Sequence, residues 1–147
     1  MKLASVLAAV AVAALGTTAV LAQQDPIAAR QELMKANGAA AKKGAAMAKG
    51  EAPFDLAEAK KIFATFENAA AKMPDLFPPN STTGHDTTAA PKIWQNMADF
   101  KARFVKLSAD AKAAEASVKD LDTFKTAFGA LGKDCGGCHQ EYRVKKN

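Results

Sequence analysis

The fold of this chain is decided by its last long segment, residues 120–142, which reads DLDTFKTAFGALGKDCGGCHQEY. Apolar residues and both cysteines recur there at alternating steps of three and four, namely Leu121, Phe124, Phe128, Leu131, Cys135, Cys138 and Tyr142. Steps of this size place residues on one face of an α-helix. The segment therefore predicts an amphipathic helix that begins near Asp120 and carries both cysteines on its buried face.

The same segment contains Cys135-Gly136-Gly137-Cys138-His139, a Cys-x-x-Cys-His pattern that is typical of covalent c-type haem attachment. On a helix, the two thiols and the imidazole project from one side. The thiols can then add to the two vinyl groups of haem as thioethers, and the imidazole can bind the iron. We therefore predict one haem c per subunit, held by Cys135 and Cys138, with His139 as the proximal axial ligand.

Three other uses of a cysteine pair agree less well with the sequence. A thiol redox pair usually opens a helix after a strand, whereas this pair lies near the end of the chain and no strand-like run precedes it. A zinc site needs about four ligands, and the second histidine, His85, lies in a polar loop. A disulfide across two intervening residues would be strained. Haem attachment is therefore the favoured interpretation.

The N-terminal residues 1–22 have the pattern of a secretory signal peptide. Lys2 supplies a positive charge, residues 3–15 form an almost unbroken apolar run, and small side chains predict cleavage after Ala22. The apolar run is too short to span a membrane comfortably, so we expect no stable membrane insertion after cleavage. The mature domain would then comprise residues 23–147 and lie in the periplasm, because c-type haem is attached outside the cytoplasm.

The balance of charges bears on the choice of partner. The full chain has a formal net charge of +5, and removal of Lys2 with the signal peptide lowers it by one. A mildly basic protein suits an acidic protein partner, so redox partner proteins with acidic surfaces are expected. The sequence contains no basic run with interleaved aromatic residues that would indicate nucleic-acid binding.

Three further amphipathic helices precede residues 120–142. The first begins at residues 25–26, where an aspartate cap is followed by proline, and ends at Gly50. The second begins at Asp55 and ends at Pro74. Four helices with mostly short connections predict an all-α fold, an antiparallel up-down-up-down four-helix bundle that encloses the covalently bound haem.

The same repeats predict which residues face the interior. In the first helix, steps of seven place Ile27, Met34, Ala41 and Ala48 on the inner face. In the third helix, the alternation of three and four continues without interruption over residues 91–114. We therefore expect one continuous third helix. We also expect the residues spaced by seven in the first helix to face the interior along its whole length.

Antiparallel order predicts which methionines share a level with His139 near the end of the last helix. Met34 lies about 14 Å along the first helix at 1.5 Å per residue, Met73 closes the second helix, and Met97 lies just inside the third. Met47 lies near the opposite end of the bundle and is excluded. The spacing alone leaves the first three methionines open as the residue that faces the iron.

This arrangement resembles the class II c-type cytochromes, the cytochrome c-prime family, over essentially the whole mature chain. The matching stretches are RQELMK at 30–35, KGEAPFD at 49–55, PKIW at 91–94, and 135–139 followed by Tyr142-Arg143. The resemblance implies that Arg30 lies near the haem propionates and that Met34 occupies the distal position facing the iron. It also implies that Arg143 covers the exposed side of the proximal histidine.

The distal residue separates two branches of this family. Most members place a non-binding apolar group there and leave the iron five-coordinate, whereas a low-spin branch uses a methionine as the sixth ligand. The residues LMK at 33–35, followed by Asn-Gly at 37–38, resemble the low-spin branch. The resemblance then implies a periplasmic carrier of single electrons with a His/Met-ligated low-spin haem. Some five-coordinate members also carry an unligated methionine here, so a protein that binds nitric oxide or carbon monoxide at an open distal face is the alternative.

We do not expect an enzyme. A haem peroxidase would need a polar acid–base group on the distal side, and the first helix offers Gln31 and Asn37 but no histidine. The resemblance also implies that a homodimer can form through the first two helices, although no decisive exposed patch is evident in the sequence.

Overall fold

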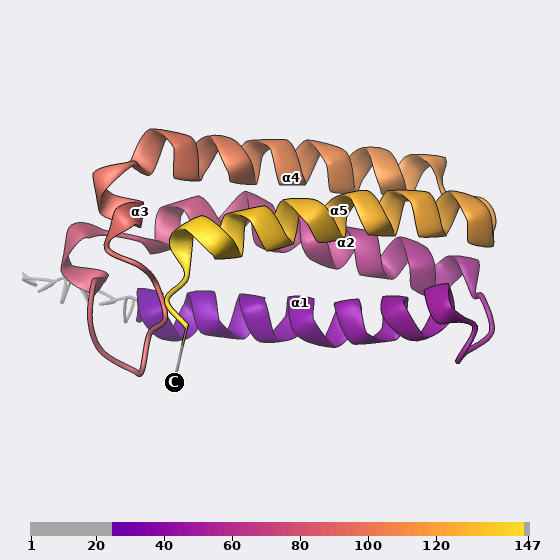
Figure 1. Cartoon of the computed structure of the whole chain (residues 1–147), viewed down its shortest axis with the longest axis horizontal. Coiled ribbons are helices and arrows are strands. Elements are labelled where there is room, and N and C mark those ends of the chain that lie inside the picture. Colours follow the sequence, from indigo (N-terminus) through magenta and orange to yellow (C-terminus); the bar gives the residue numbers. More distant parts are fainter. Residues whose placement is uncertain (1–24, 146–147) are drawn as a thin grey trace, which may run out of the picture.

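The computed structural model describes residues 25–145, so the predicted signal peptide and its cleavage after Ala22 lie outside the described residues. The elements are α1 (Pro26–Lys49), α2 (Leu56–Lys72), η1 (Met73–Leu76), η2 (Pro79–Ser81), α3 (Lys92–Gln95), α4 (Met97–Ser117) and α5 (Leu121–Tyr142). The four long helices lie side by side, and α1 and α5 run in opposite directions (Figure 1). The predicted all-α four-helix bundle is confirmed. No helix within this part of the chain is apolar enough over a sufficient length to cross a membrane.

The ends of α1 and the start of α5 lie where the sequence predicts them, and each has a local capping contact. The carboxylate of Asp25 accepts hydrogen bonds from the backbone N–H groups of the first turn of α1, at 2.8 and 3.2 Å. Gly50 ends α1 with a φ of 78°, a left-handed conformation that glycine adopts without strain. Asp120 and Thr123 form a reciprocal capping box at the start of α5. Local chemistry thus sets the start of α5 and both ends of α1.

The prediction of one continuous third helix is wrong. Asn96 has φ −133° and ψ 48°, which interrupts the helix and separates the short α3 from α4. The apolar repeat passes through this break because both pieces face the same core, where Ile93 and Phe100 belong to one cluster. The short α3 also carries Trp94, whose indole N–H lies 3.2 Å from the backbone oxygens of Phe77 and Pro78. The break therefore lets α3 support the long loop that follows α2.

The predicted inner face of α1 is only partly correct. Its buried residues are Ile27, Arg30, Ala40, Gly44 and Met47. Ala41 and Ala48 are partly buried and lie against the edge of the core. The second half of α1 packs into a cluster formed with α2 and α5, and this packing turns Met47 inward in place of Ala48.

One close contact sets the register of α1 against α5. A Cβ atom added at Gly44 would lie 2.4 Å from Cε2 of Phe128, far inside normal contact distance. The Phe128 ring is itself confined by Phe124, with 5.3 Å between ring centroids. Glycine at position 44 therefore allows the two helices to approach each other at this level.

We expect Gly44→Ala to destabilise the bundle by about 1–3 kcal/mol, because the Phe128 ring must move to admit the methyl group. This loss would exceed the gain in helix propensity, which is at most about 1 kcal/mol. The measurement is urea unfolding of the haem-loaded protein. Gly129→Ala is the matched control, since a Cβ there meets nothing within 4 Å. Equal effects of the two substitutions would show that the close contact does not constrain the bundle.

Candidate functional site

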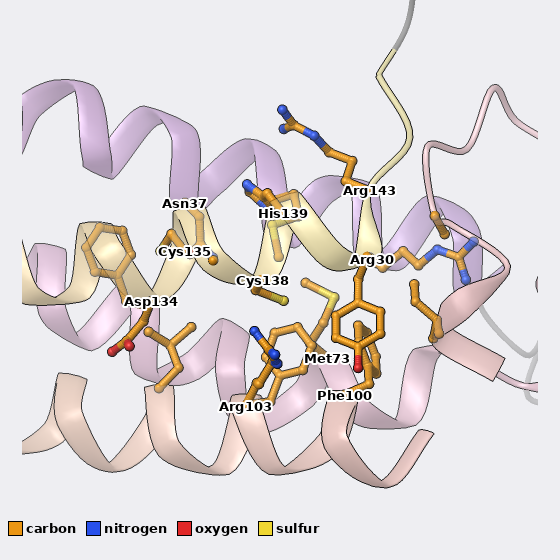
Figure 2. Close-up of a pocket in the computed structure, with 18 of the residues that line it drawn as sticks. Arg30, Asn37, Met73, Phe100, Arg103, Asp134, Cys135, Cys138, His139 and Arg143 are labelled. Atoms are coloured by element: carbon orange, nitrogen blue, oxygen red, sulfur yellow. The ribbon is translucent and has the colours of Figure 1, made fainter. Parts of the chain in front are cut away.

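A cavity of about 720 Å³ lies where the C-terminal part of α5 faces α1 and α4 (Figure 2). Its apolar wall is formed by Phe66, Met73, Phe77, Ile93, Phe100, Phe104, Leu107 and Phe128. The cavity is also lined by all six predicted site residues, namely Arg30, Met34, Cys135, Cys138, His139 and Arg143. Its size, its apolar wall and the thiols and imidazole on one side fit a haem.

The last turns of α5 bring Cys135, Cys138 and His139 to the cavity wall (Figure 2). Burial raises the pKa of both thiols, so both are held in the neutral form. Burial also lowers the pKa of His139, and the positive charge of Arg143 lowers it further. A neutral imidazole is the form that binds a metal. The local electrostatics therefore suit axial ligation by His139.

The antiparallel register brings Met34 level with the cysteine–histidine turn. Met34 lies ten residues before Gly44 on α1, and Cys138 lies ten residues after Phe128 on α5. Both helices rise about 1.5 Å per residue, so the Gly44–Phe128 contact places Met34 opposite Cys138 and next to the level of His139. Both residues line the same cavity.

The other methionines differ in position. Met73 also lines the cavity but is 1% exposed and belongs to the core cluster beneath it. Met97 packs against that cluster and does not line the cavity. Met47 lies in the other core cluster, at the far end of the bundle as predicted. Met34 is therefore the methionine on the wall that faces α5.

Arg30 makes contacts that sequence reasoning missed. Its guanidinium donates to the backbone oxygens of Leu76 and Ser81 and to the hydroxyls of Ser81 and Thr87, at 2.9 to 3.1 Å. It also stacks over the ring of Phe77, with 4.4 Å to the centroid. The side chain is 4% exposed, and burial lowers its pKa. Arg30 thus ties α1 to the loop beyond α2, and no sequence signal marks acceptors 46 to 57 residues away.

Arg143 follows the last residue of α5 and is exposed. The segment around it pairs with the long loop, because the N–H of Ala90 donates to the oxygen of Tyr142 at 3.0 Å and that of Val144 to the oxygen of Thr88 at 2.9 Å. Thr88, Ala89, Tyr142 and Arg143 all line the cavity, so the paired segments form part of its wall. His85 lies elsewhere on the loop and pairs with Asp25 at 2.8 Å, so it does not join the cysteines.

Two polar features of the cavity wall involve contacts or burial that the sequence did not show. The side-chain oxygen of Asn37 is buried and has no hydrogen-bond partner among the described residues. On the opposite wall, Asp99 accepts hydrogen bonds from Arg103 and from the hydroxyl of Tyr142. The spacing of Asp99 and Arg103 predicts a pair on one helix, but their link to Tyr142 depends on how α4 packs against α5.

Comparison with known proteins gives consistent matches. The family model described as Cytochrome C' matches residues 25–143. The chain is 44% identical over 133 residues to cytochrome c' of Rhodopseudomonas palustris, covering 90% of this chain and 91% of the relative. It is 43% identical over 147 residues to cytochrome c-556 of Agrobacterium fabrum, covering 99% of each. The solved structure of cytochrome c' from Rhodopseudomonas palustris superposes with a TM-score of 0.82 at 44% identity, covering 85% of this chain and 100% of that one.

Proposed function

Because this chain belongs to the cytochrome c' family of class II c-type cytochromes, with haem c as its cofactor, we propose that it carries single electrons in the periplasm. In this proposal Cys135 and Cys138 hold the haem as thioethers. His139 is the proximal ligand of the iron and Met34 is the distal ligand. The protein exchanges electrons with acidic redox partner proteins and catalyses no reaction of its own.

The observation that carries the proposal is the level of Met34 opposite Cys138 in one cavity. When bound, haem c supplies the one-electron couple of its iron. Ligation by histidine and methionine raises the reduction potential of haem iron. Two fixed protein ligands also limit rearrangement when the electron arrives or leaves. Ligation of the iron by both His139 and Met34 would therefore suit a carrier better than a protein with an open iron site.

The other cavity residues have supporting roles in the proposal. The aromatic wall excludes water, and Arg30 offers a buried cation for the haem propionates, since its polar partners among the described residues are all neutral. Arg143 covers the exposed side of His139. Gly38 and Gly132 line the cavity on α1 and α5, and a Cβ added at either position would meet nothing within 4 Å.

The proposal includes the cellular location and assembly of the protein. Residues 1–22 act as a signal peptide that is removed after Ala22, and residues 23–147 form the periplasmic domain. The homodimer implied by the family resemblance would form through α1 and α2.

The alternative function is that of a five-coordinate protein that binds nitric oxide or carbon monoxide at an open iron site. The similarity to a relative named cytochrome c', at 44% identity, supports this alternative.

Optical and resonance Raman spectra of the purified ferric and ferrous protein test the proposed function. We expect low-spin spectra in both states, with the weak charge-transfer band of a sulfur–iron bond in the ferric form. Carbon monoxide should bind slowly to the ferrous protein, because the methionine must leave first. A high-spin ferrous protein that binds carbon monoxide rapidly would overturn the carrier function and support the alternative.

A further inference from the structure

The wall of the cavity formed by α4 and α5 carries an ion pair joined to a tyrosine. Oδ2 of Asp99 accepts a hydrogen bond from Nε of Arg103 at 2.7 Å and another from the hydroxyl of Tyr142. The guanidinium carbon of Arg103 also lies 5.5 Å from the centre of the Tyr142 ring. All three residues line the cavity. The carboxylate therefore receives two donors, one from each helix.

This ion pair lies close to the turn that we propose holds the haem. Tyr142 follows Cys138 by one helical turn on α5 and is 4% exposed. Figure 2 shows Arg103 extending from α4 into the pocket toward Cys138. Asp99, Arg103 and Cys138 all line the same cavity. Both charges therefore lie on the wall where Cys138 would join the porphyrin.

A charge at this position affects the two oxidation states differently. Ferric haem carries one more positive charge than ferrous haem, so a nearby cation favours the ferrous state and a nearby anion favours the ferric state. Arg103 and Asp99 thus act in opposite directions on the same equilibrium. We propose that Asp99 and Arg103 set the reduction potential of the haem as an opposed pair, and that Tyr142 is the positioning residue that holds Asp99 on the cavity wall.

Two neighbouring sets of ion pairs lack such a link to a tyrosine. Lys106 is shared between Asp110 and Asp134, at 2.6 and 2.8 Å, and Lys92 pairs with Glu141 at the edge of the bundle. Among the described residues, neither Lys106 nor Lys92 is linked through these pairs to a buried side chain. The link from Asp99 to a buried tyrosine fixes that pair relative to the cysteine–histidine turn.

The test is a spectroelectrochemical titration of the haem-loaded protein at low ionic strength, where screening of these partly exposed charges is weakest. We expect Arg103→Gln to lower the ferrous-to-ferric ratio at a fixed ambient potential about threefold, and Asp99→Asn to raise it about threefold. A threefold change is about 28 mV at 59 mV per tenfold for one electron. The double variant should return close to the wild-type potential, because both charges are then absent.

Lys43→Gln is the matched control, since it breaks a 2.7 Å ion pair with Glu58 away from the cavity and should leave the potential unchanged. Shifts of the two single variants in the same direction, or shifts no larger than that of the control, would overturn the proposal. If either variant fails to fold by circular dichroism, Tyr142→Phe replaces it. Loss of the hydroxyl donor releases the Asp99 carboxylate from the cavity wall and should raise the ratio, in the same direction as Asp99→Asn, and an unchanged or lowered ratio would overturn the proposal.

This inference rests on the proposed attachment of haem at Cys138 but not on ligation by Met34. The wild-type spectrum reports whether a methionine binds the iron, whereas the opposite shifts report the charge pair. Opposite shifts in a five-coordinate protein would therefore retain this inference while the carrier function fails. If the variants and the wild type have equal reduction potentials in a six-coordinate protein, the carrier function would stand and this inference would fail.

Discussion

Replacing Met34 with leucine is expected to convert the haem from a low-spin, six-coordinate form to a high-spin, five-coordinate form. Leucine has a similar volume and keeps the cavity wall apolar, so the change removes the sulfur ligand with little effect on packing. If the methionine-bound form outnumbers the open form by ten to one, the apparent affinity for carbon monoxide should rise about tenfold. Loss of the sulfur–iron band and stopped-flow mixing with carbon monoxide measure both effects.

Two other methionines provide controls for this experiment. Met97→Leu lies outside the cavity lining and should leave the spectrum unchanged. Met73→Leu alters the buried floor of the cavity and should change stability more than ligation. An unchanged spectrum in Met34→Leu, together with a high-spin spectrum in Met73→Leu, would transfer the distal role to Met73.

The double substitution of Cys135 and Cys138 by serine is expected to abolish covalent attachment of haem. Serine is close in size to cysteine, but its hydroxyl does not form the thioether. Haem should then be extracted by acidified organic solvent, whereas it should remain with the wild-type chain. Intact-mass measurement after extraction gives the result directly, and the melting temperature should also fall because a ligand that binds the folded state stabilises it.

Single variants and a neighbouring position make this experiment more specific. Each single serine variant should retain one thioether and keep its haem through extraction. Gly136→Ala lies between the cysteines in open space and should leave attachment intact. Retention of haem by the double variant after extraction would contradict attachment at Cys135 and Cys138.

Much of the fold could be predicted from the sequence because local chemistry specifies it. Asp25, Gly50 and Asp120 act on backbone groups within a few residues of themselves, and their effects are visible in the sequence. The break at Asn96 was not predictable in this way. The apolar repeat continues across it, because a single non-helical residue leaves Ile93 and Phe100 on the same core.

The candidate site shows the same division between local and distant effects. Cys135, Cys138 and His139 lie within five residues, so their spacing alone predicts one binding face. The family resemblance predicted that Arg30 lies near the haem, but it did not predict the hydrogen bonds of Arg30. The four acceptors lie on the loop after α2, and the sequence has no periodic pattern there from which the loop conformation could be predicted. The link between Asp99 and Tyr142 depends on the rotation of α4 against α5, which spacing within one helix does not determine.

The short span of the attachment turn has a consequence for unfolding in the proposed haem-loaded protein. Thioether bonds at Cys135 and Cys138 persist when the bundle comes apart, and His139 remains beside them. Met34 lies 105 residues before His139, so its approach to the iron requires the native tertiary structure. The denatured chain thus keeps its haem and one axial ligand and loses the other. Colour and spin state then report global folding directly, and refolding begins from a chain that already carries its cofactor.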